Sequence, residues 1–250
     1  MFKSKLKTRQ LLVGGWNSIP SSDVAEIIAK TSVDWVAIDL EHSLYDLKTL
    51  KDSIRAIQGV GNVAFVRLPD HGSTLIKQVL DFGIDGLIVP SVDSADQAVS
   101  IMRACRYMPM GARGVGLGRA QNYGASFDSY LQSYQSRLTT ILQIESATGV
   151  SNLPEILSVE GVDGIFVGPY DLSCSLGCPG DFSSPEFLRA LGKIKTVCGV
   201  YEVPMGIHVV QPCNERLANY IEAGFSFIAY GVDFTILSHG LETSLEIRRS

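Results

Sequence analysis

The chain has 250 residues, of which 46% are hydrophobic and 19% are charged, a balance typical of globular proteins and not of disordered chains. A chain of this length can bury about three quarters of its unfolded surface around one core, so we expect a single domain over residues 1–250. The net charge of −5, with no dense run of Lys or Arg, argues against nucleic acid or an anionic membrane as the main partner. Small molecules are the expected ligands.

The beginning of the sequence and the cysteines both indicate a cytoplasmic protein. Residues Met1–Gln10 are basic but lack the apolar core of a signal peptide, and no apolar run in the chain reaches about 18 residues. The five cysteines form no C-x-x-C pair, which is typical of reduced thiols. Cys174 and Cys178 are close in sequence, but no further Cys or His lies nearby to complete a zinc site.

Apolar, β-branched runs alternate along the chain with stretches of helical spacing, a pattern that predicts repeated βα units. The predicted strands are Leu11–Asn17, Trp35–Glu41, Asn62–Leu68, Gly86–Val92, Thr140–Glu145, Gly164–Gly168, Pro204–Val210 and Phe227–Gly231. The predicted helices are Ser22–Thr31, Leu47–Gln58, Thr74–Phe82, Ser94–Cys105, Gly149–Ser158, Ser184–Gly199, Asn214–Ala223 and Phe234–Arg249. Eight such pairs in order close into an α/β fold, a single (β/α)₈ TIM barrel.

Two helix starts carry capping signals. Ser22 precedes Asp23 and Glu26 in a capping arrangement, and Ser94 followed by Gln97 resembles a capping box. Both patterns support the boundaries assigned to the first and fourth predicted helices.

The segment Arg106–Arg137 interrupts the alternation and is too long for a simple helix-to-strand connection. Insertions of this kind usually serve function or oligomer contacts. Its glycines between Gly111 and Arg119 do not have the spacing of a dinucleotide-binding fingerprint, and no strand leads directly into them. We therefore do not expect a nucleotide cofactor.

In a TIM barrel the chemistry lies at the carboxyl ends of the strands, where two carboxylates follow the adjacent fifth and sixth strands. Neighbouring strands are about 4.8 Å apart, so Glu145 and Asp171 can converge on one ion. Two carboxylates without imidazole or thiolate suit a hard cation such as Mg²⁺ or Mn²⁺. The alternative is that each residue caps the following helix or forms a surface ion pair; together they favour a metal site.

Three further residues at the same rim suggest acid–base chemistry. His42 is a candidate general base for removing a proton from a carbon beside a carbonyl, and Asp39 or Glu41 could orient it. Arg67 could hold a carboxylate or an oxyanion, or instead pair with a rim carboxylate such as Asp39 or Glu41. His208 lies within the seventh strand, and we interpret it as a satisfied core residue.

These motifs resemble the HpcH/HpaI family of class II, pyruvate-dependent aldolases, which includes 4-hydroxy-2-oxoheptanedioate aldolase and 2-dehydro-3-deoxyglucarate aldolase. The resemblance runs from about Gly14 to Val232, with the motifs in the family's order and spacing. The residues that carry it are Asp39-Leu40-Glu41-His42-Ser43, Val66-Arg67, Arg113-Gly114-Val115-Gly116 with Arg119-Ala120, Gln143-Ile144-Glu145-Ser146, and Val167-Gly168-Pro169-Tyr170-Asp171-Leu172-Ser173.

The resemblance implies retro-aldol cleavage of a 4-hydroxy-2-oxo acid to pyruvate and an aldehyde, or the reverse addition. Pyruvate would chelate a divalent metal ion, Mg²⁺ or Mn²⁺ with Co²⁺ as a further candidate, that acts as a Lewis acid. The implied roles are as follows: Glu145 and Asp171 as metal ligands, His42 as proton shuttle, Arg67 as enolate stabiliser, Gln143, Tyr170 and Asp171 as pyruvate-positioning groups, and Asp39 and Asp81 as acidic partners of His42.

Other implications of the resemblance are less direct. The strand assignment places Asp81 near the start of the fourth strand, on the face away from the rim. Family members resemble hexamers built from dimers with an exchanged last helix, so we expect a homo-oligomer. Met108-Pro109-Met110-Gly111 and Leu68 depart from the family pattern and leave the acceptor aldehyde open.

Two other functions are alternatives to the aldolase. One is an enolate-condensing synthase or lyase on the same scaffold, citrate-synthase-like or carboxyl-transforming, which would act on oxaloacetate or an acyl thioester. The other is a non-catalytic barrel used for assembly. A non-catalytic barrel would be expected to lack some of the charged residues at the rim. All the rim residues that match the family motifs are present in this sequence.

Overall fold

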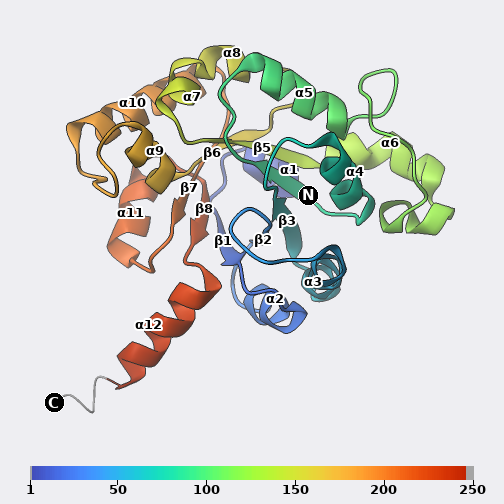
Figure 1. The fold of residues 1–250 in the computed structure, drawn as a ribbon, viewed down its shortest axis with the longest axis horizontal. Coiled ribbons are helices and arrows are strands. Elements are labelled where there is room, and N and C mark those ends of the chain that lie inside the picture. The colour runs from blue at the N-terminus through green and yellow to red at the C-terminus, as the bar shows by residue number, and fades with distance from the viewer. Residues whose placement is uncertain (1, 246–250) are drawn as a thin grey trace.

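The computed structural model describes residues 2–245 and contains a closed barrel of eight parallel strands in the order β1 to β8. The strands are β1 Leu12–Asn17, β2 Trp35–Asp39, β3 Val63–Arg67, β4 Gly86–Val89, β5 Thr139–Ile144, β6 Gly164–Val167, β7 Met205–Val209 and β8 Phe227–Tyr230. Each predicted strand is present, with ends that differ by at most three residues. The predicted TIM barrel is confirmed (Figure 1).

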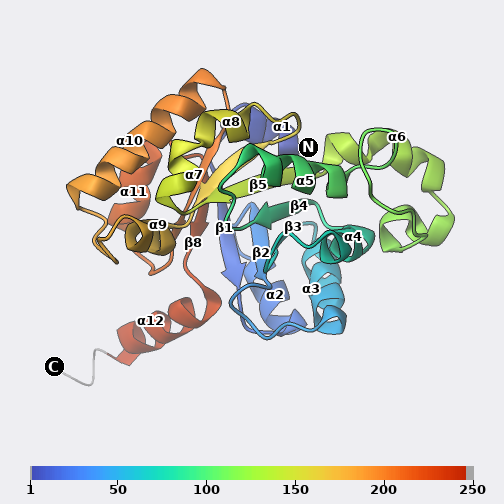
Figure 2. The same ribbon diagram turned by 45° about the horizontal axis from the view of Figure 1, so that its top comes forward.

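Helices surround the barrel on its outside (Figure 1 and Figure 2). They are α1 Phe2–Lys7, α2 Ser22–Ala29, α3 Leu47–Gly59, α4 Ser73–Asp81, α5 Ala95–Cys105, the 3₁₀ helix η1 Arg119–Gly124, α6 Phe127–Arg137, α7 Ala147–Ser151, α8 Leu153–Leu157, α9 Pro169–Ser175, α10 Pro185–Val200, α11 Asn214–Glu222 and α12 Asp233–Leu245. Within residues 2–245, no helix has the length and apolar character needed to cross a membrane.

Several helices differ from the prediction. The helices α1, η1, α6 and α9 were not predicted. The predicted helix Gly149–Ser158 is two short helices, because Pro154 has no N–H for a continuous helix and disfavours helical backbone at the residue before it. Of the predicted last helix Phe234–Arg249, residues 246–249 lie outside the described part of the chain.

The two predicted caps have different outcomes. The capping box at the start of α5 is confirmed. The Ser94 side chain accepts a hydrogen bond from the backbone N–H of Gln97, and the Gln97 side chain accepts one from the backbone N–H of Ser94. The cap assigned to Ser22 is wrong: the N-cap of α2 is Ser21, whose side chain accepts from Val24 N. Ser21 has the extended backbone that a cap requires, whereas Ser22 is already helical.

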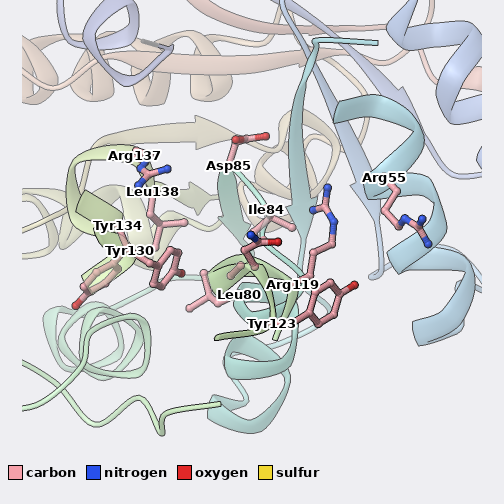
Figure 3. Close-up of a pocket in the computed structure, with 13 residues that line it drawn as sticks. Arg55, Leu80, Ile84, Asp85, Arg119, Tyr123, Tyr130, Tyr134, Arg137 and Leu138 are labelled. Atoms are coloured by element: carbon pink, nitrogen blue, oxygen red, sulfur yellow. The ribbon is translucent and has the colours of Figure 1, made fainter. Parts of the chain in front are cut away.

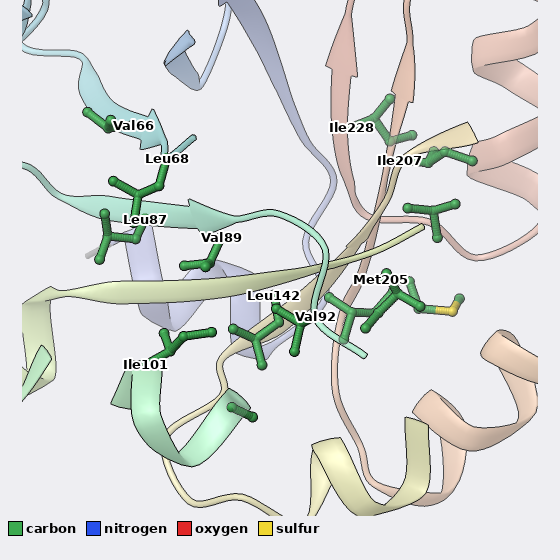
Figure 4. Close-up of a cluster of buried hydrophobic side chains, with 14 of the residues drawn as sticks. Val66, Leu68, Leu87, Val89, Val92, Ile101, Leu142, Met205, Ile207 and Ile228 are labelled. Atoms are coloured by element: carbon green, nitrogen blue, oxygen red, sulfur yellow. The ribbon is translucent and has the colours of Figure 1, made fainter. Parts of the chain in front are cut away.

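The core has two layers, divided by the alternation of side chains along each strand. The outer layer lies between strands and helices, and Figure 4 shows part of it, with Val66, Leu87 and Leu142 among its residues. The inner layer fills the barrel with Trp35, Phe65, Ile141, Phe166 and Phe227 among others. Because inward positions recur every second residue, residues 39, 67 and 143 also point into the barrel, above this layer.

The helix α1 lies at the amino end of the barrel. Its Leu6 is fully buried in the inner layer, and the ring of Phe2 packs edge-on against Phe65 and Phe227, with centroids 5.3 and 6.2 Å away. The amino end is therefore filled with side chains, and only the carboxyl end of the barrel opens to solvent.

A glycine in β1 tests how tightly the inner layer is packed. A Cβ on Gly14 would lie 2.1 Å from the indole of Trp35, which is itself stacked on Phe227 at 4.1 Å. We expect Gly14→Ala to lower the free energy of unfolding by about 1–3 kcal/mol, measured by urea denaturation, because the ring must move against a filled core.

The matched control for this substitution is Gly192→Ala in α10, where no heavy atom lies within 4 Å of the added Cβ. This variant should gain roughly 0.5–1 kcal/mol, because Ala is the better helix former. Equal stability of the Gly14→Ala protein and the wild type would contradict the packing described for the inner layer.

Candidate active site

A cavity of about 310 Å³ opens at the carboxyl ends of the strands. Its wall includes Asp39, His42, Arg67, Gln143, Asp171 and His208, so it brings together most of the residues predicted from the sequence. Glu145 is buried beside it and contacts Gln143. A TIM barrel places its chemistry at this end, which makes the cavity the candidate active site.

The centre of the site is an ion pair between Asp39 and Arg67, which lie side by side in the register of β2 and β3. The guanidinium donates from Nε and Nη2 to the two carboxylate oxygens of Asp39, at 2.9 and 2.7 Å. The indole N–H of Trp16 approaches the same carboxylate at 3.3 Å, and its ring lies 5.0 Å from the guanidinium carbon. The ion pair that the sequence allowed as a structural role for Arg67 is therefore present.

Burial and ion pairing shift the pKa values of Asp39 and Arg67 in opposite directions. Burial alone would raise the pKa of Asp39, but the hydrogen bonds and the positive charge of Arg67 outweigh it, and the net pKa is lowered. Burial would likewise lower the pKa of Arg67, and Asp39 raises it above its usual value. Both groups therefore stay charged.

Arg67 keeps capacity for a further anion. A guanidinium has five N–H bonds, and Asp39 takes two of them. Nη1 lies 2.9 Å from Oε2 of Glu41, although that oxygen makes no well-aligned hydrogen bond within residues 2–245. The remaining N–H bonds can therefore serve Glu41 and an oxyanion in the cavity.

His42 lies at the mouth of the cavity, on the loop that follows β2. Its backbone N–H, like that of Glu41, donates to Oδ1 of Asp39, at 3.3 and 3.0 Å. The imidazole is exposed and makes no hydrogen bond with any described residue. Asp39 thus holds the backbone of this loop in place and does not contact the His42 ring.

Asp81 is not brought to the cavity within this chain. It is the last residue of α4, and its carboxylate accepts from Nη2 of Arg113 at 2.7 Å. Arg113 comes from the Arg106–Arg137 insertion, so this ion pair fastens the insertion to α4. A role for Asp81 beside His42 stays a prediction.

Glu145 and Gln143 form the second half of the site, at the end of β5. Oε1 of Glu145 accepts from both the N–H and the hydroxyl of Ser91, each at 2.7 Å, and Oε2 contacts the Gln143 amide nitrogen. Ser91 has a left-handed backbone, with a φ of 53°, which a non-glycine residue rarely adopts. Glu145 is therefore held by neighbouring strands, and the cap of the following helix is Ser146, not Glu145.

The surroundings of Glu145 test whether a cation fits. A Cβ on Gly168 would lie 2.6 Å from Oε2 of Glu145, so only glycine leaves this carboxylate accessible from β6. The buried Oε1 of Gln143 has no hydrogen-bond partner in the described part of the chain. Asp171 is exposed in the first turn of α9 and also lines the cavity. Oxygen donors with space beside them are what a hard cation requires, so the residues fit one.

The excess of negative charge in the site also favours a bound cation. Four carboxylates lie close enough to Arg67 or to one another to act on each other's pKa values: Asp39, Glu41, Glu145 and Asp171. Among the residues described, Arg67 is the cation that acts on Glu41. Burial raises the pKa of Glu41 to about 7, opposed by Arg67 and reinforced by the other three carboxylates. No group of three or more His, Cys, Asp or Glu residues among those described could hold a metal. A cation here would have two carboxylate ligands and would need water or substrate for its other positions.

A second cavity, of about 470 Å³, lies between α4 and the insertion, and Figure 3 shows the residues that line it. Ile84 and Asp85, which precede β4, form part of its wall, as do Arg119 and Tyr130 from the insertion. It is larger than the rim cavity but lies at the amino ends of β4 and β5, away from the predicted catalytic residues. We therefore place the chemistry at the rim.

Sequence reasoning missed three residues of the site. Trp16 and Ser91 follow or end apolar strands, and their position at the carboxyl end of a strand was the available signal. His208 was interpreted as a satisfied core residue, whereas it is half-buried and lines the cavity. Its inward direction follows from the outward burial of Ile207 and Val209 in the same strand.

The model of the HpcH/HpaI aldolase/citrate lyase family matches residues 13–240 of the sequence. This chain belongs to that family. It is 36% identical to a hydroxypyruvate/pyruvate aldolase of Roseobacter denitrificans, over 94% of this chain and 92% of that protein. It is 39% identical to a 4-hydroxy-2-oxo-heptane-1,7-dioate aldolase of Shigella boydii, over 96% and 92%.

A solved structure of a family member from Burkholderia cenocepacia has the same fold, with a TM-score of 0.94 and 32% identity, covering 100% of this chain and 99% of that one. The match to family members therefore extends over the whole barrel and includes both halves of the site. The resemblance stated from the sequence motifs is confirmed.

The raised pKa of Glu41 predicts a pH-dependent stability. The pKa rises from its ordinary value of 4.5 to about 7, so the folded protein holds a proton between these values that the unfolded chain has lost. The folded state then binds more protons, and stability must fall as the pH rises from about 4.5 to 7. We expect the melting temperature of metal-free wild type to fall more steeply over this range than that of Glu41→Gln.

The difference between the two proteins isolates Glu41 from other titrating groups. Added Mg²⁺ should reduce this difference, because a cation favours the ionised carboxylate. Parallel curves for wild type and Glu41→Gln in metal-free buffer would show that Glu41 titrates normally.

Proposed function

We propose that this chain catalyses the reversible retro-aldol cleavage of a 4-hydroxy-2-oxo acid to pyruvate and an aldehyde, through a pyruvate enolate. Membership of the aldolase family supports a carbon–carbon lyase. The observation that carries the proposal is one cavity that is lined by the fixed guanidinium of Arg67 and by Asp171, with the Glu145 carboxylate left accessible beside it by Gly168. A 2-oxo acid has oxygens for both the guanidinium and a cation held by the two carboxylates.

The metal proposed here is Mg²⁺ or Mn²⁺, with Co²⁺ as a further candidate. Held by Glu145 and Asp171, it would supply Lewis-acid chemistry at the keto oxygen. Ser91 fixes the Glu145 carboxylate through two hydrogen bonds, so this ligand is positioned before the ion arrives. Gln143 and the backbone at Tyr170 and Asp171 are proposed to orient the pyruvate portion, for which the backbone N–H groups are hydrogen-bond donors.

Arg67 and His42 are the proposed catalytic residues. Arg67 stabilises negative charge on the enolate oxygen, and Asp39 keeps its guanidinium in one orientation. His42 moves the proton, for which an exposed imidazole at the cavity mouth has access to both substrate and water. Asp81 is proposed as an acidic partner of His42 only from the family pattern, since Arg113 engages its carboxylate here.

The helix α12 supports the proposal of a homo-oligomer, for which we propose a hexamer. It projects away from the barrel (Figure 1 and Figure 2), and several of its large apolar residues are exposed. Phe234, Leu237 and Leu241 are 50, 68 and 61% exposed. A contiguous apolar face of this kind usually marks a protein contact. We also propose a cytoplasmic location, because all five cysteines are free thiols.

The first test of the function is proton exchange at the methyl group of pyruvate. Chelator-treated wild type is incubated with pyruvate in D₂O, with and without Mg²⁺ or Mn²⁺, and followed by proton NMR. We expect deuteration only with metal. Glu145→Gln and Asp171→Asn should lose most of the exchange and bind Mn²⁺ more weakly, because each removes a charged ligand.

The matched control is Glu186→Gln, which changes an exposed carboxylate in the first turn of α10. It should exchange like the wild type. Absence of exchange under every metal, together with turnover of oxaloacetate or an acyl thioester, would replace the aldolase proposal with the synthase alternative.

A second test concerns the guanidinium group of Arg67. We expect Arg67→Lys to lower kcat by about 10²-fold or more, because an ammonium cannot hold both oxygens of Asp39 and the enolate oxygen together. Steady-state release of pyruvate measures the rate, and circular dichroism verifies the fold. Arg189→Lys on the exposed face of α10 is the control. Wild-type turnover by the Arg67→Lys protein would remove Arg67 from the mechanism.

A further inference from the structure

His208 is a histidine of the cavity wall that the proposed mechanism does not use. It lies in β7 between Ile207 and Val209, which are fully buried in the outer layer, so its own side chain points into the barrel. Its ring packs against Trp16, with centroids 4.5 Å apart, and Arg67 lies over the same indole at 5.0 Å. His208 and Arg67 are thus two neighbours of one indole at the floor of the cavity.

The hydrogen bond of His208 fixes which ring nitrogen carries the proton. Nε2 lies 3.1 Å from the backbone carbonyl of Gly231, and a carbonyl oxygen can only accept, so Nε2 is the donor. Burial lowers the pKa of His208 to about 4, so the ring is neutral near pH 7. Nδ1 is then a hydrogen-bond acceptor, and it makes no hydrogen bond within residues 2–245.

The side chains around His208 determine which ligand groups its Nδ1 can bind. Near His208 the cavity wall is otherwise apolar, formed by Phe166, Val210 and Val232 with the Trp16 ring. The charged groups that act on His208 are Arg67 and Asp39, which pair with each other, and the N–H bonds that Arg67 has left suit an oxyanion and not a hydroxyl donor. His208 is half-buried and lines the cavity, so its free acceptor is within reach of a ligand there. An acceptor in such a place selects ligand groups that donate a hydrogen bond.

We infer that His208 forms a hydroxyl-binding subsite, in which Nδ1 accepts a hydrogen bond from a hydroxyl group of the substrate. This inference rests on the proposed aldolase function and narrows its substrate class to hydroxylated compounds. Because His208 shares the Trp16 indole with Arg67, which holds the enolate oxygen, the hydroxyl belongs to the oxo acid that forms the enolate. Hydroxypyruvate carries such a group and pyruvate does not.

Two substitutions separate the two ring nitrogens. His208→Gln places an amide N–H near the position of Nε2, so it keeps a donor for Gly231 but lacks the acceptor. His208→Asn places an amide oxygen near the position of Nδ1, so it keeps the acceptor but lacks that donor. A general loss of packing would affect both variants, whereas loss of the acceptor affects only His208→Gln.

The experiment compares kcat/KM for hydroxypyruvate and pyruvate, with acetaldehyde as acceptor and Mg²⁺ present, in the wild type and both variants. We expect the hydroxypyruvate-to-pyruvate ratio to fall about tenfold in His208→Gln and to stay near the wild-type value in His208→Asn. A second arm compares glycolaldehyde with acetaldehyde, with pyruvate as the oxo acid. A tenfold change confined to this arm would assign the bound hydroxyl to the aldehyde.

Equal ratios in all three proteins, or the same loss in both variants, would overturn the subsite while leaving the aldolase proposal intact. A wild-type protein that neither deuterates pyruvate nor condenses either oxo acid would overturn the proposed function, and the subsite with it. Measurements on the wild type decide the proposed function, and the ratios measured for the two variants decide the subsite, so the two failures are distinguishable.

Discussion

The ion pair between Asp39 and Arg67 organises the candidate site. It joins the ends of β2 and β3 at one register position, and the Asp39 carboxylate also receives the backbone N–H groups that begin the His42 loop. A buried guanidinium needs a carboxylate to remain stable, and here that carboxylate also fixes the loop. One interaction thus sets the orientation of Arg67, the course of the chain after β2, and the position of His42.

The same ion pair leaves a surplus of negative charge. Arg67 pairs with Asp39 and also lies 2.9 Å from Glu41, but its one positive charge cannot balance the four carboxylates Asp39, Glu41, Glu145 and Asp171. Burial and the neighbouring carboxylates raise the pKa of Glu41 to about 7, and a bound divalent cation would lower this pKa again. Binding of the proposed cation would therefore be coupled to release of a proton. The coupling would arise from geometry, because Glu41, Glu145 and Asp171 come from different strand ends that the barrel brings together.

Much of the fold could be predicted because the strands of a parallel barrel are continuous apolar runs, each followed by a helix. The rim residues Asp39, Arg67 and Glu145 could be predicted for a related reason, since a charged residue at the end of such a run points to the cavity. The helix α9, which carries Asp171, was not predicted, because at seven residues it is too short for a periodic pattern. Contacts between segments distant in sequence, such as Ser91 with Glu145 and Asp81 with Arg113, leave no local pattern.

His208 was assigned to the core from the sequence, although it belongs to the cavity wall. A histidine inside an apolar strand was interpreted as part of the core, and its hydrogen bond to Gly231 fits that interpretation. The sequence could not show that the inner layer ends just below it, with Phe166 and Phe227, so that its ring faces the cavity and not another side chain. The level at which a packed barrel interior ends depends on side chains from all eight strands together.

The filled amino end of the barrel has a kinetic consequence. With α1 seated in the inner layer, and Trp35 and Phe65 fully buried above it, the cavity is a dead end with one mouth. Every reactant must enter and leave through that mouth, past Tyr170 and His42. The compound bound nearest the floor arrives first and departs last, so the order of binding is dictated by depth. For the proposed cleavage, the depth of the cavity predicts that the aldehyde leaves before the oxo acid.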